Sequence, residues 1–121
     1  MNDNLKTYRR LTLGELIATL DQLGDATVEG LDGLVDSYRG YYERNATEPC
    51  NYQESATVLA NQYREQIGKP ITGYKGGDYT VDEGELIYYA AYGRSGPNII
   101  GLEPTETSVY RPVLLEQDYH L

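Results

Sequence analysis

The chain of 121 residues contains no tryptophan, no phenylalanine, one cysteine and one histidine. Its single cysteine, Cys50, has no partner for an intramolecular disulfide, which excludes a small domain held together by disulfide bonds. Cys50 and His120 are also too few for a zinc site built from thiolate and imidazole ligands. A serine or cysteine nucleophile would need His120 as its base, from a terminal segment that we expect to be loosely held. We therefore expect a protein that is not an enzyme.

Long hydrophobic runs are missing as well. No apolar stretch approaches the ~20 residues that cross a membrane, and the opening residues, MNDNLKTYRR, lack the apolar segment of a signal peptide. We therefore expect no membrane contact and a cytoplasmic location. A globular chain of this length buries roughly two-thirds of its unfolded surface, which is enough for one domain with a modest core.

Positive charge is scarce, because 10 Lys and Arg residues stand against 19 Asp and Glu residues, giving a formal net charge of -9. Most of such a surface repels phosphate groups, so we expect no general binding to nucleic acid. The balance is compatible with a small basic pocket inside an acidic surface. It is equally compatible with an acidic face that competes with nucleic acid for a basic partner.

Tyrosine is the only aromatic residue and occurs 13 times. Tyrosines must therefore occupy the aromatic positions of the core, where each buried hydroxyl needs a hydrogen-bond partner or water. A core of this size has no use for so many rings, so we expect several to line an accessible surface.

Two helices are predicted. The first spans residues 12–23, because Thr12 and Glu15 have the spacing of a capping box and apolar residues follow at helical spacing. The second spans residues 55–67, where apolar residues again recur on one side and Gly68 ends the pattern.

Strands are predicted in the remaining regular segments, which are 26–31, 37–44, 71–74, 78–81, 85–92, 98–102 and 109–115. We expect the first two to form a hairpin and residues 45–54 to form a loop. The fold class that follows is α+β, with two helices packed on one face of a mostly antiparallel sheet of four to six strands.

The predicted domain organisation has three parts. Residues 1–10 form a flexible N-terminus, and residues 11–102 form a single α+β domain. Residues 103–121 form an extended C-terminal segment that is either an edge strand or an arm for oligomerisation.

Two segments combine a cation, glycine and several tyrosines, namely SYRGYYE at 37–43 and TGYKGGDY at 72–79. Consecutive glycines expose backbone N–H groups that can hold an anion, and a neighbouring cation adds charge-assisted hydrogen bonds. Tyrosine rings offer flat faces to a nucleotide base. The predicted ligand-binding residues are Arg39, Tyr41, Tyr74, Lys75, Gly76, Gly77 and Tyr79, together with Arg94 in a third glycine-containing loop.

The alternative for the same residues is structural. The glycines then form turns, the tyrosines belong to the core, and Arg39 pairs with Glu43. A further cluster, Asp78, Asp82, Glu83 and Glu85, lacks the spacing of a calcium-binding loop, so we interpret it as a solvated acidic turn. We predict no metal site and no cofactor.

The order of these motifs resembles a family of small bacteriophage proteins whose function is uncharacterised. The matching features cover roughly residues 11–102 and are TLGELI at 12–17, SYRGYYE at 37–43, GK at 68–69, TGYKGG at 72–77 and YG at 92–93. The resemblance implies a phage context and supplies no catalytic residues. Many small accessory proteins of phages act against host defences, either by sequestering a nucleotide signal or by blocking a defence protein.

These observations lead to one main expectation and two alternatives. The main expectation is a protein that sequesters a phosphorylated small molecule, most concretely a nucleotide-derived immune signal, in the cytoplasm of an infected bacterium. A chain this small offers little wall for such a ligand, so we expect a homo-oligomer. The first alternative is an acidic inhibitor of a host defence protein or nucleic-acid enzyme, and the second is a structural role in virion assembly.

Overall fold

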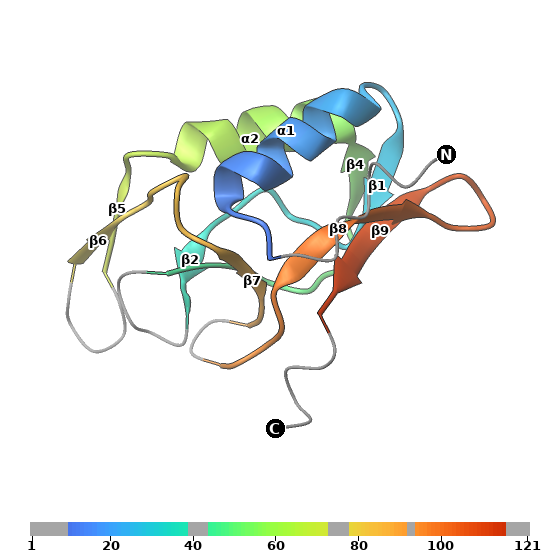
Figure 1. Cartoon of the computed structure of the whole chain (residues 1–121). Coiled ribbons are helices and arrows are strands. Elements are labelled where there is room, and N and C mark those ends of the chain that lie inside the picture. Colours follow the sequence, from blue (N-terminus) through green and yellow to red (C-terminus); the bar gives the residue numbers. More distant parts are fainter. Residues whose placement is uncertain (1–9, 39–43, 73–77, 92–93, 116–121) are drawn as a thin grey trace.

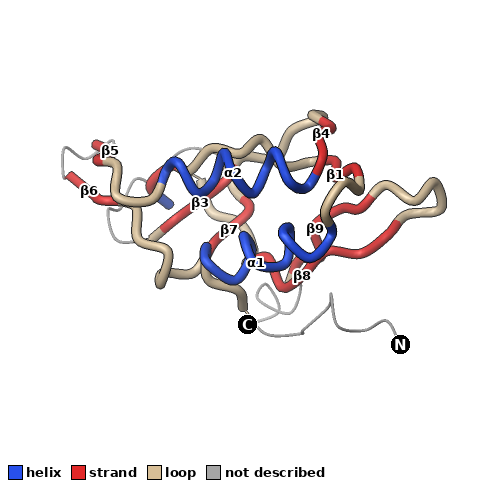
Figure 2. The backbone as a smooth tube through the Cα atoms, turned by 90° about the horizontal axis from the view of Figure 1, so that it is seen from above, coloured by secondary structure: helices blue, strands red, loops and turns tan. Residues whose placement is uncertain are grey.

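The protein is an α+β domain, as the sequence predicts. The computed structural model describes residues 10–38, 44–72, 78–91 and 94–115. Its helices, α1 (Leu13–Leu23) and α2 (Ala56–Gln66), lie side by side along one side of the molecule (Figures 1 and 2). Neither of these described helices is long and apolar enough to cross a membrane.

The strands form three sheets in place of the single sheet expected. The first has the order β4 (Gln53–Ser55), β1 (Thr27–Glu29), β9 (Tyr110–Leu114) and β8 (Ile99–Pro104). The second has the order β2 (Asp36–Ser37), β3 (Asn45–Thr47) and β7 (Ile87–Tyr89). The third is the pair β5 (Pro70–Thr72) and β6 (Asp78–Thr80). Most pairings are antiparallel, while β1–β9 and β3–β7 are parallel.

Leu11, which lies two residues before helix α1, connects the two larger sheets. The Leu11 N–H donates to the carbonyl of Ile99 at 3.0 Å, and the Leu11 carbonyl accepts from the N–H of Ile87 at 3.0 Å. An isolated bridge between Tyr88 and Asn98 adds a further link between β7 and the start of β8. These contacts fix the position of β7 relative to the four-stranded sheet.

Both helices begin where the sequence predicts. The Thr12 hydroxyl accepts from the Glu15 N–H at 3.1 Å, and the Glu15 carboxylate accepts from the Thr12 N–H at 2.9 Å, which completes the capping box. Ser55 caps α2 by accepting from the N–H of Val58 at 3.2 Å. The helix faces that meet in the core are formed by Leu13, Leu16, Ile17, Leu20, Leu59, Ala60 and Tyr63.

The predicted hairpin between 26–31 and 37–44 is wrong. β1 pairs with β4 on one side and β9 on the other, while β2 pairs with β3. The predicted loop at 45–54 is also wrong in part, because it contains β3 and β4. β3 has the sequence Asn-Ala-Thr and is buried along its whole length, so no hydrophobic alternation marks it as a strand.

The C-terminal strand lies inside the sheet. β9 is placed between β1 and β8, and its Tyr110 and Leu114 side chains pack against the core. Residues 110–114 are therefore not the edge strand that the sequence suggested, because β9 pairs with β8 along its length and with β1 at Tyr110. Residues 116–121, where an oligomerisation arm remains a prediction, lie outside the described residues, as do residues 1–9 of the N-terminus.

Replacing Thr12 with Ala tests the first cap. Loss of the hydroxyl leaves helix N–H groups unsatisfied, so the free energy of unfolding should fall by about 1 kcal/mol and the Tm by about 3–5 °C. Thr12→Ser keeps the accepting oxygen and should stay within about 0.5 kcal/mol of the natural chain. Urea unfolding of the three proteins measures both effects. Equal losses in the two variants would assign the effect to the Thr12 methyl group instead of the cap.

Candidate functional site

The predicted ligand-binding residues divide into two groups. Tyr79 and Arg94 are described by the structure. The others lie outside the described residues, and they are Arg39, Tyr41, Tyr74, Lys75, Gly76 and Gly77. What the structure does show is the base of each segment that contains them.

The two main motifs begin and end at paired backbone. The Tyr38 N–H donates to the carbonyl of Arg44 at 2.9 Å, which closes the base of 39–43. Thr72 pairs with Asp78, so residues 73–77 connect two strands that pair antiparallel. β2 and β5 are in contact. The structure therefore brings the bases of both motifs to the same end of the molecule.

The third loop is attached to the same place. The Tyr38 hydroxyl donates to the carbonyl of Gly96 at 3.0 Å and accepts from the Gly96 N–H at 3.2 Å. A Cβ atom at Gly96 would lie 2.2 Å from the carbonyl oxygen of Tyr89 and 3.0 Å from the Ala90 Cβ. Glycine is thus required here because the loop backbone lies directly against the end of β7.

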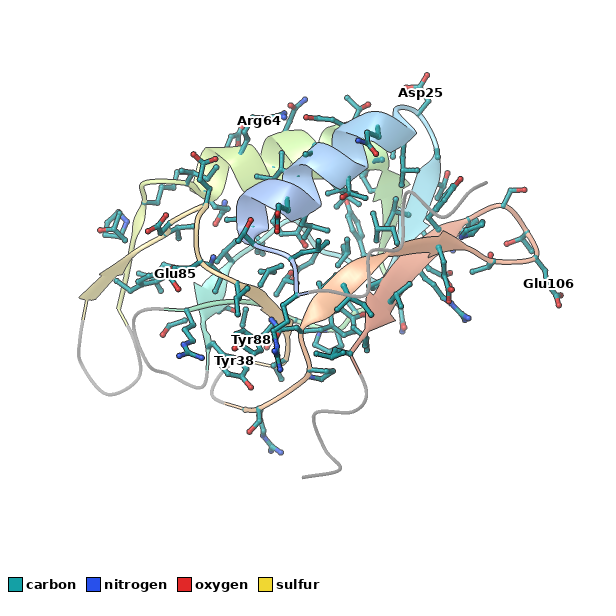
Figure 3. The ribbon with its side chains drawn as sticks, viewed as in Figure 1. Asp25, Tyr38, Arg64, Glu85, Tyr88 and Glu106 are labelled. Atoms are coloured by element: carbon teal, nitrogen blue, oxygen red, sulfur yellow. The ribbon has the colours of Figure 1, made fainter. Side chains whose placement is uncertain are left out.

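A pair of stacked tyrosines occupies the centre of this arrangement. The rings of Tyr38 and Tyr88 have centroids 3.8 Å apart and an interplanar angle of 13°. Figure 3 shows them beside each other near the end of β7. Such ring contacts contribute roughly 0.5–1.5 kcal/mol beyond the area they bury. Tyr88 is buried, and its hydroxyl accepts from Nη1 of Arg44 at 3.1 Å.

We call the group formed by Tyr38, Arg44, Tyr88, Arg94 and Gly96 the tyrosine-pair site. Tyr38 follows β2, Arg44 precedes β3, Tyr88 belongs to β7, and the last two residues come from the loop before β8. The site thus joins segments that are far apart in the sequence. Arg94 was predicted from the sequence to bind a ligand, whereas Tyr38, Arg44 and Tyr88 were not.

Tyr79 belongs to the core and not to a ligand surface. Its side chain is 6% exposed, its hydroxyl donates to Oδ1 of Asn45 at 2.5 Å, and it accepts from the N–H of Asp82 at 3.4 Å. Burial raises the pKa of Tyr79 to about 12, with Glu85 and Asp82 adding to the rise and the Asp82 N–H opposing it. The ring presents no open face on which a base could stack, which corrects its predicted role.

The partner of Tyr79 ties this end of the molecule together. Asn45 is fully buried, and its Nδ2 donates to the carbonyls of Asp82 at 3.0 Å and Glu85 at 3.2 Å. All the strong hydrogen-bonding positions of this amide are therefore engaged within the fold. The acidic turn that follows β6 is thereby fixed to β3, directly beside Arg44.

The acidic turn is exposed, as predicted. Asp82 and Glu83 face solvent, and Oδ1 of Asp82 accepts from the Gly84 N–H at 2.8 Å. Within the described ranges no group of three His, Cys, Asp or Glu side chains is placed to hold a metal ion.

The cations at this end differ from the others in the described chain. Arg64 pairs with Asp21, Arg111 pairs with Glu103, and Arg10 donates to the Asn98 side chain. Across residues 10–38, 44–72, 78–91 and 94–115, the cations without an ion-pair partner are Arg44, Lys69 and Arg94. Two of these three belong to the tyrosine-pair site, in a protein with an overall excess of carboxylates.

An open groove of about 420 Å³ lies apart from this site. It is lined by Glu29, Gly30, Cys50, Asn51, Tyr89, Arg111 and Pro112. Neither Tyr79 nor Arg94, the two predicted ligand-binding residues that the structure describes, lines it.

No protein-family model, curated protein or solved structure matches the chain.

Replacing Tyr79 with Phe tests its structural role. Asn45 then keeps a buried oxygen without a donor, so the free energy of unfolding should fall by about 1–3 kcal/mol at pH 7. The hydroxyl of Tyr52 is exposed. Tyr52→Phe is therefore a matched control, and it should change the free energy of unfolding by less than about 0.5 kcal/mol.

The hydrogen bond between Tyr79 and Asn45 also predicts how stability changes at alkaline pH. The Tyr79 pKa is higher in the folded state than its ordinary value of 10, so its neutral phenol stabilises the fold fully below pH 10 and progressively less as the pH rises toward 12. The stability gap between the natural chain and Tyr79→Phe should therefore narrow over that range in urea unfolding. A gap that is absent at pH 7 would contradict the assignment.

Replacing Gly96 with Ala tests how the third loop is attached. The added Cβ collides with the backbone of β7, so the loop must move and the free energy of unfolding should fall by about 1–3 kcal/mol. Gly84→Ala is the control, since its Cβ would meet only the flexible Asp82 side chain at 3.3 Å. Thermal unfolding of both variants measures the difference, and equal stabilities would show that the close approach at Gly96 is unimportant.

Proposed function

We propose that the protein binds and sequesters a phosphorylated small molecule at the tyrosine-pair site, and so inhibits an antiviral defence. The most concrete ligand is a nucleotide-derived immune signal in the cytoplasm of a phage-infected bacterium. The observation that carries the proposal is that β2, which ends at the base of residues 39–43, contacts β5 at the second motif, while Tyr38 holds the third loop through Gly96 and stacks on Tyr88. Before folding, these segments are separated by long stretches of chain.

The residue types at this end suit a phosphorylated ligand. Arg44 and Arg94 are exposed and have no ion-pair partner in the described part of the chain. Arginine donates several hydrogen bonds in a fixed geometry that matches phosphate oxygens. Further cations and glycines, Arg39, Lys75, Gly76 and Gly77, belong in sequence to the segments whose bases meet here.

The proposal includes self-association. The site is formed from loop bases on one small domain. A ligand with several phosphates needs more protein surface around it than one such domain offers. We therefore propose a homo-oligomer in which neighbouring subunits enclose the ligand, a state that native mass spectrometry reports directly.

One observation favours a second function, inhibition of a host protein by direct contact. Leu34, Tyr52 and Val58 are 54%, 44% and 38% exposed. Tyrosine side chains, of which Tyr52 is the exposed example here, are enriched among the residues that contribute most to protein interfaces. A host defence protein or nucleic-acid enzyme is the partner class for this alternative, with the acidic character of the chain attracting a basic surface.

Native mass spectrometry separates the two functions. The protein is purified from bacteria with an active nucleotide-signalling defence, and any bound species is released by denaturation and identified. A phosphorylated small molecule at a fixed ratio to subunits supports sequestration. A bound host polypeptide supports the alternative, and an empty protein that also fails to bind a panel of nucleotides and cyclic dinucleotides contradicts sequestration.

Variants of two loop cations test the site. Arg94→Ala and Lys75→Ala should each weaken binding of the released ligand at least tenfold, about 1.4 kcal/mol, because each removes charge-assisted hydrogen bonds to phosphate. The Tm should change by less than about 2 °C, since Arg94 is exposed and has no ion pair in the described chain. Arg64→Ala removes a cation whose carboxylate partner is known and should leave affinity unchanged. Isothermal titration calorimetry measures the ligand affinity of the three variants. Unchanged affinity in both Arg94→Ala and Lys75→Ala would contradict this placement of the ligand.

A further inference from the structure

Arg44 has a fixed backbone position. Its carbonyl accepts from the Tyr38 N–H at 2.9 Å. The next residue, Asn45, is fully buried and its side chain makes hydrogen bonds to three partners. The side chain of Arg44 therefore starts from a rigid point and reaches the surface from there.

The guanidinium of Arg44 is oriented but not neutralised. Its Nη1 donates to the Tyr88 hydroxyl at 3.1 Å, and no carboxylate in the described ranges pairs with it. A guanidinium carries five N–H donors, so most of those on Arg44 have no acceptor among the residues that the structure describes.

The hydroxyl of Tyr88 complements this arrangement. Because its oxygen accepts from Arg44, its own hydrogen points elsewhere, and no acceptor for it is found within the described residues. The ring itself is held by the stack on Tyr38 and by the pairing of Tyr88 with Ala46. A hydroxyl that accepts from a cation becomes a stronger donor. Arg44 and Tyr88 together thus present several donors and a positive charge at one place.

We propose that Arg44 and Tyr88 form the element that binds an oxyanion, the phosphate or diphosphate group of the ligand. Arg44 supplies the charge and two or more N–H donors, while Tyr88 supplies one O–H donor and holds the guanidinium in place. The inference rests on the proposed function and makes it more specific, because it assigns the anionic group of the ligand to residues next to the tyrosine stack. Arg39, the arginine that the sequence favours, is not needed for this element.

Inorganic pyrophosphate is the probe, and titration calorimetry of the full chain is the measurement. Arg44→Ala should weaken pyrophosphate binding at least tenfold. Arg44→Lys keeps the charge but loses the planar set of donors, and should weaken it about three- to tenfold. Tyr88→Phe keeps the ring stack and removes the hydroxyl, and should also weaken it about three- to tenfold.

A purely structural role makes a different prediction. It lowers the Tm of Arg44→Ala and Tyr88→Phe and leaves the affinity of the folded protein unchanged, whereas the proposal expects lower affinity with the Tm within about 2 °C. Arg64→Ala is the matched control, an exposed arginine on α2 whose loss should not alter pyrophosphate binding.

The outcomes separate this inference from the function on which it rests. Unchanged pyrophosphate affinity in Arg44→Ala and Tyr88→Phe, or no pyrophosphate binding by the natural chain, overturns the inference. If Arg94→Ala and Lys75→Ala still weaken binding of a nucleotide probe in that case, the proposed function stands with a different anion site. If the natural chain binds neither pyrophosphate nor any nucleotide, both are wrong.

Discussion

The hydrogen-bonding needs of buried tyrosine hydroxyls shape this fold. A chain without phenylalanine or tryptophan can only use tyrosine as a large core ring, and every buried phenol must find a partner. The partners come from polar residues and backbone placed inside the protein. The observed pairs are Tyr63 with Thr47, Tyr79 with Asn45, Tyr89 with the carbonyl of Gly30, Tyr88 with Arg44, and Tyr38 with Gly96. The buried polar strand β3 is a direct result, since it carries two of these partners.

The same requirement creates the tyrosine-pair site. Two tyrosines at the margin of the core find their partners in loop backbone and in an arginine, so loops and cation are drawn to one place. A phenylalanine in either position would keep the stack and lose these attachments. Within this pair the Tyr38 hydroxyl attaches the third loop to the fold, and the Tyr88 hydroxyl is the group that we assign to ligand binding.

Features set by neighbours in the sequence were predictable, and features set by distant contacts were not. The capping box of Thr12 and Glu15 identifies the first helix because it spans only three residues, and the apolar spacing within residues 55–67 identifies the second. β3 was missed because burial of Asn45 depends on Tyr79 and on the turn after β6, which no local pattern reports. In the site, composition pointed to Arg94 but misassigned Tyr79, and the importance of Arg44 appears only through its contact with Tyr88.

The central place of β9 also bears on how the protein is made. β9 lies between β1 and β8 and is synthesised about eighty residues after β1. The four-stranded sheet therefore lacks this strand until residues 110–114 have emerged. The helix pair is complete much earlier and offers a surface on which early collapse can occur. During that interval the facing edges of β1 and β8 are open to pairing with other chains. Nascent chains of this protein are therefore exposed to such pairing until residues 110–114 have emerged.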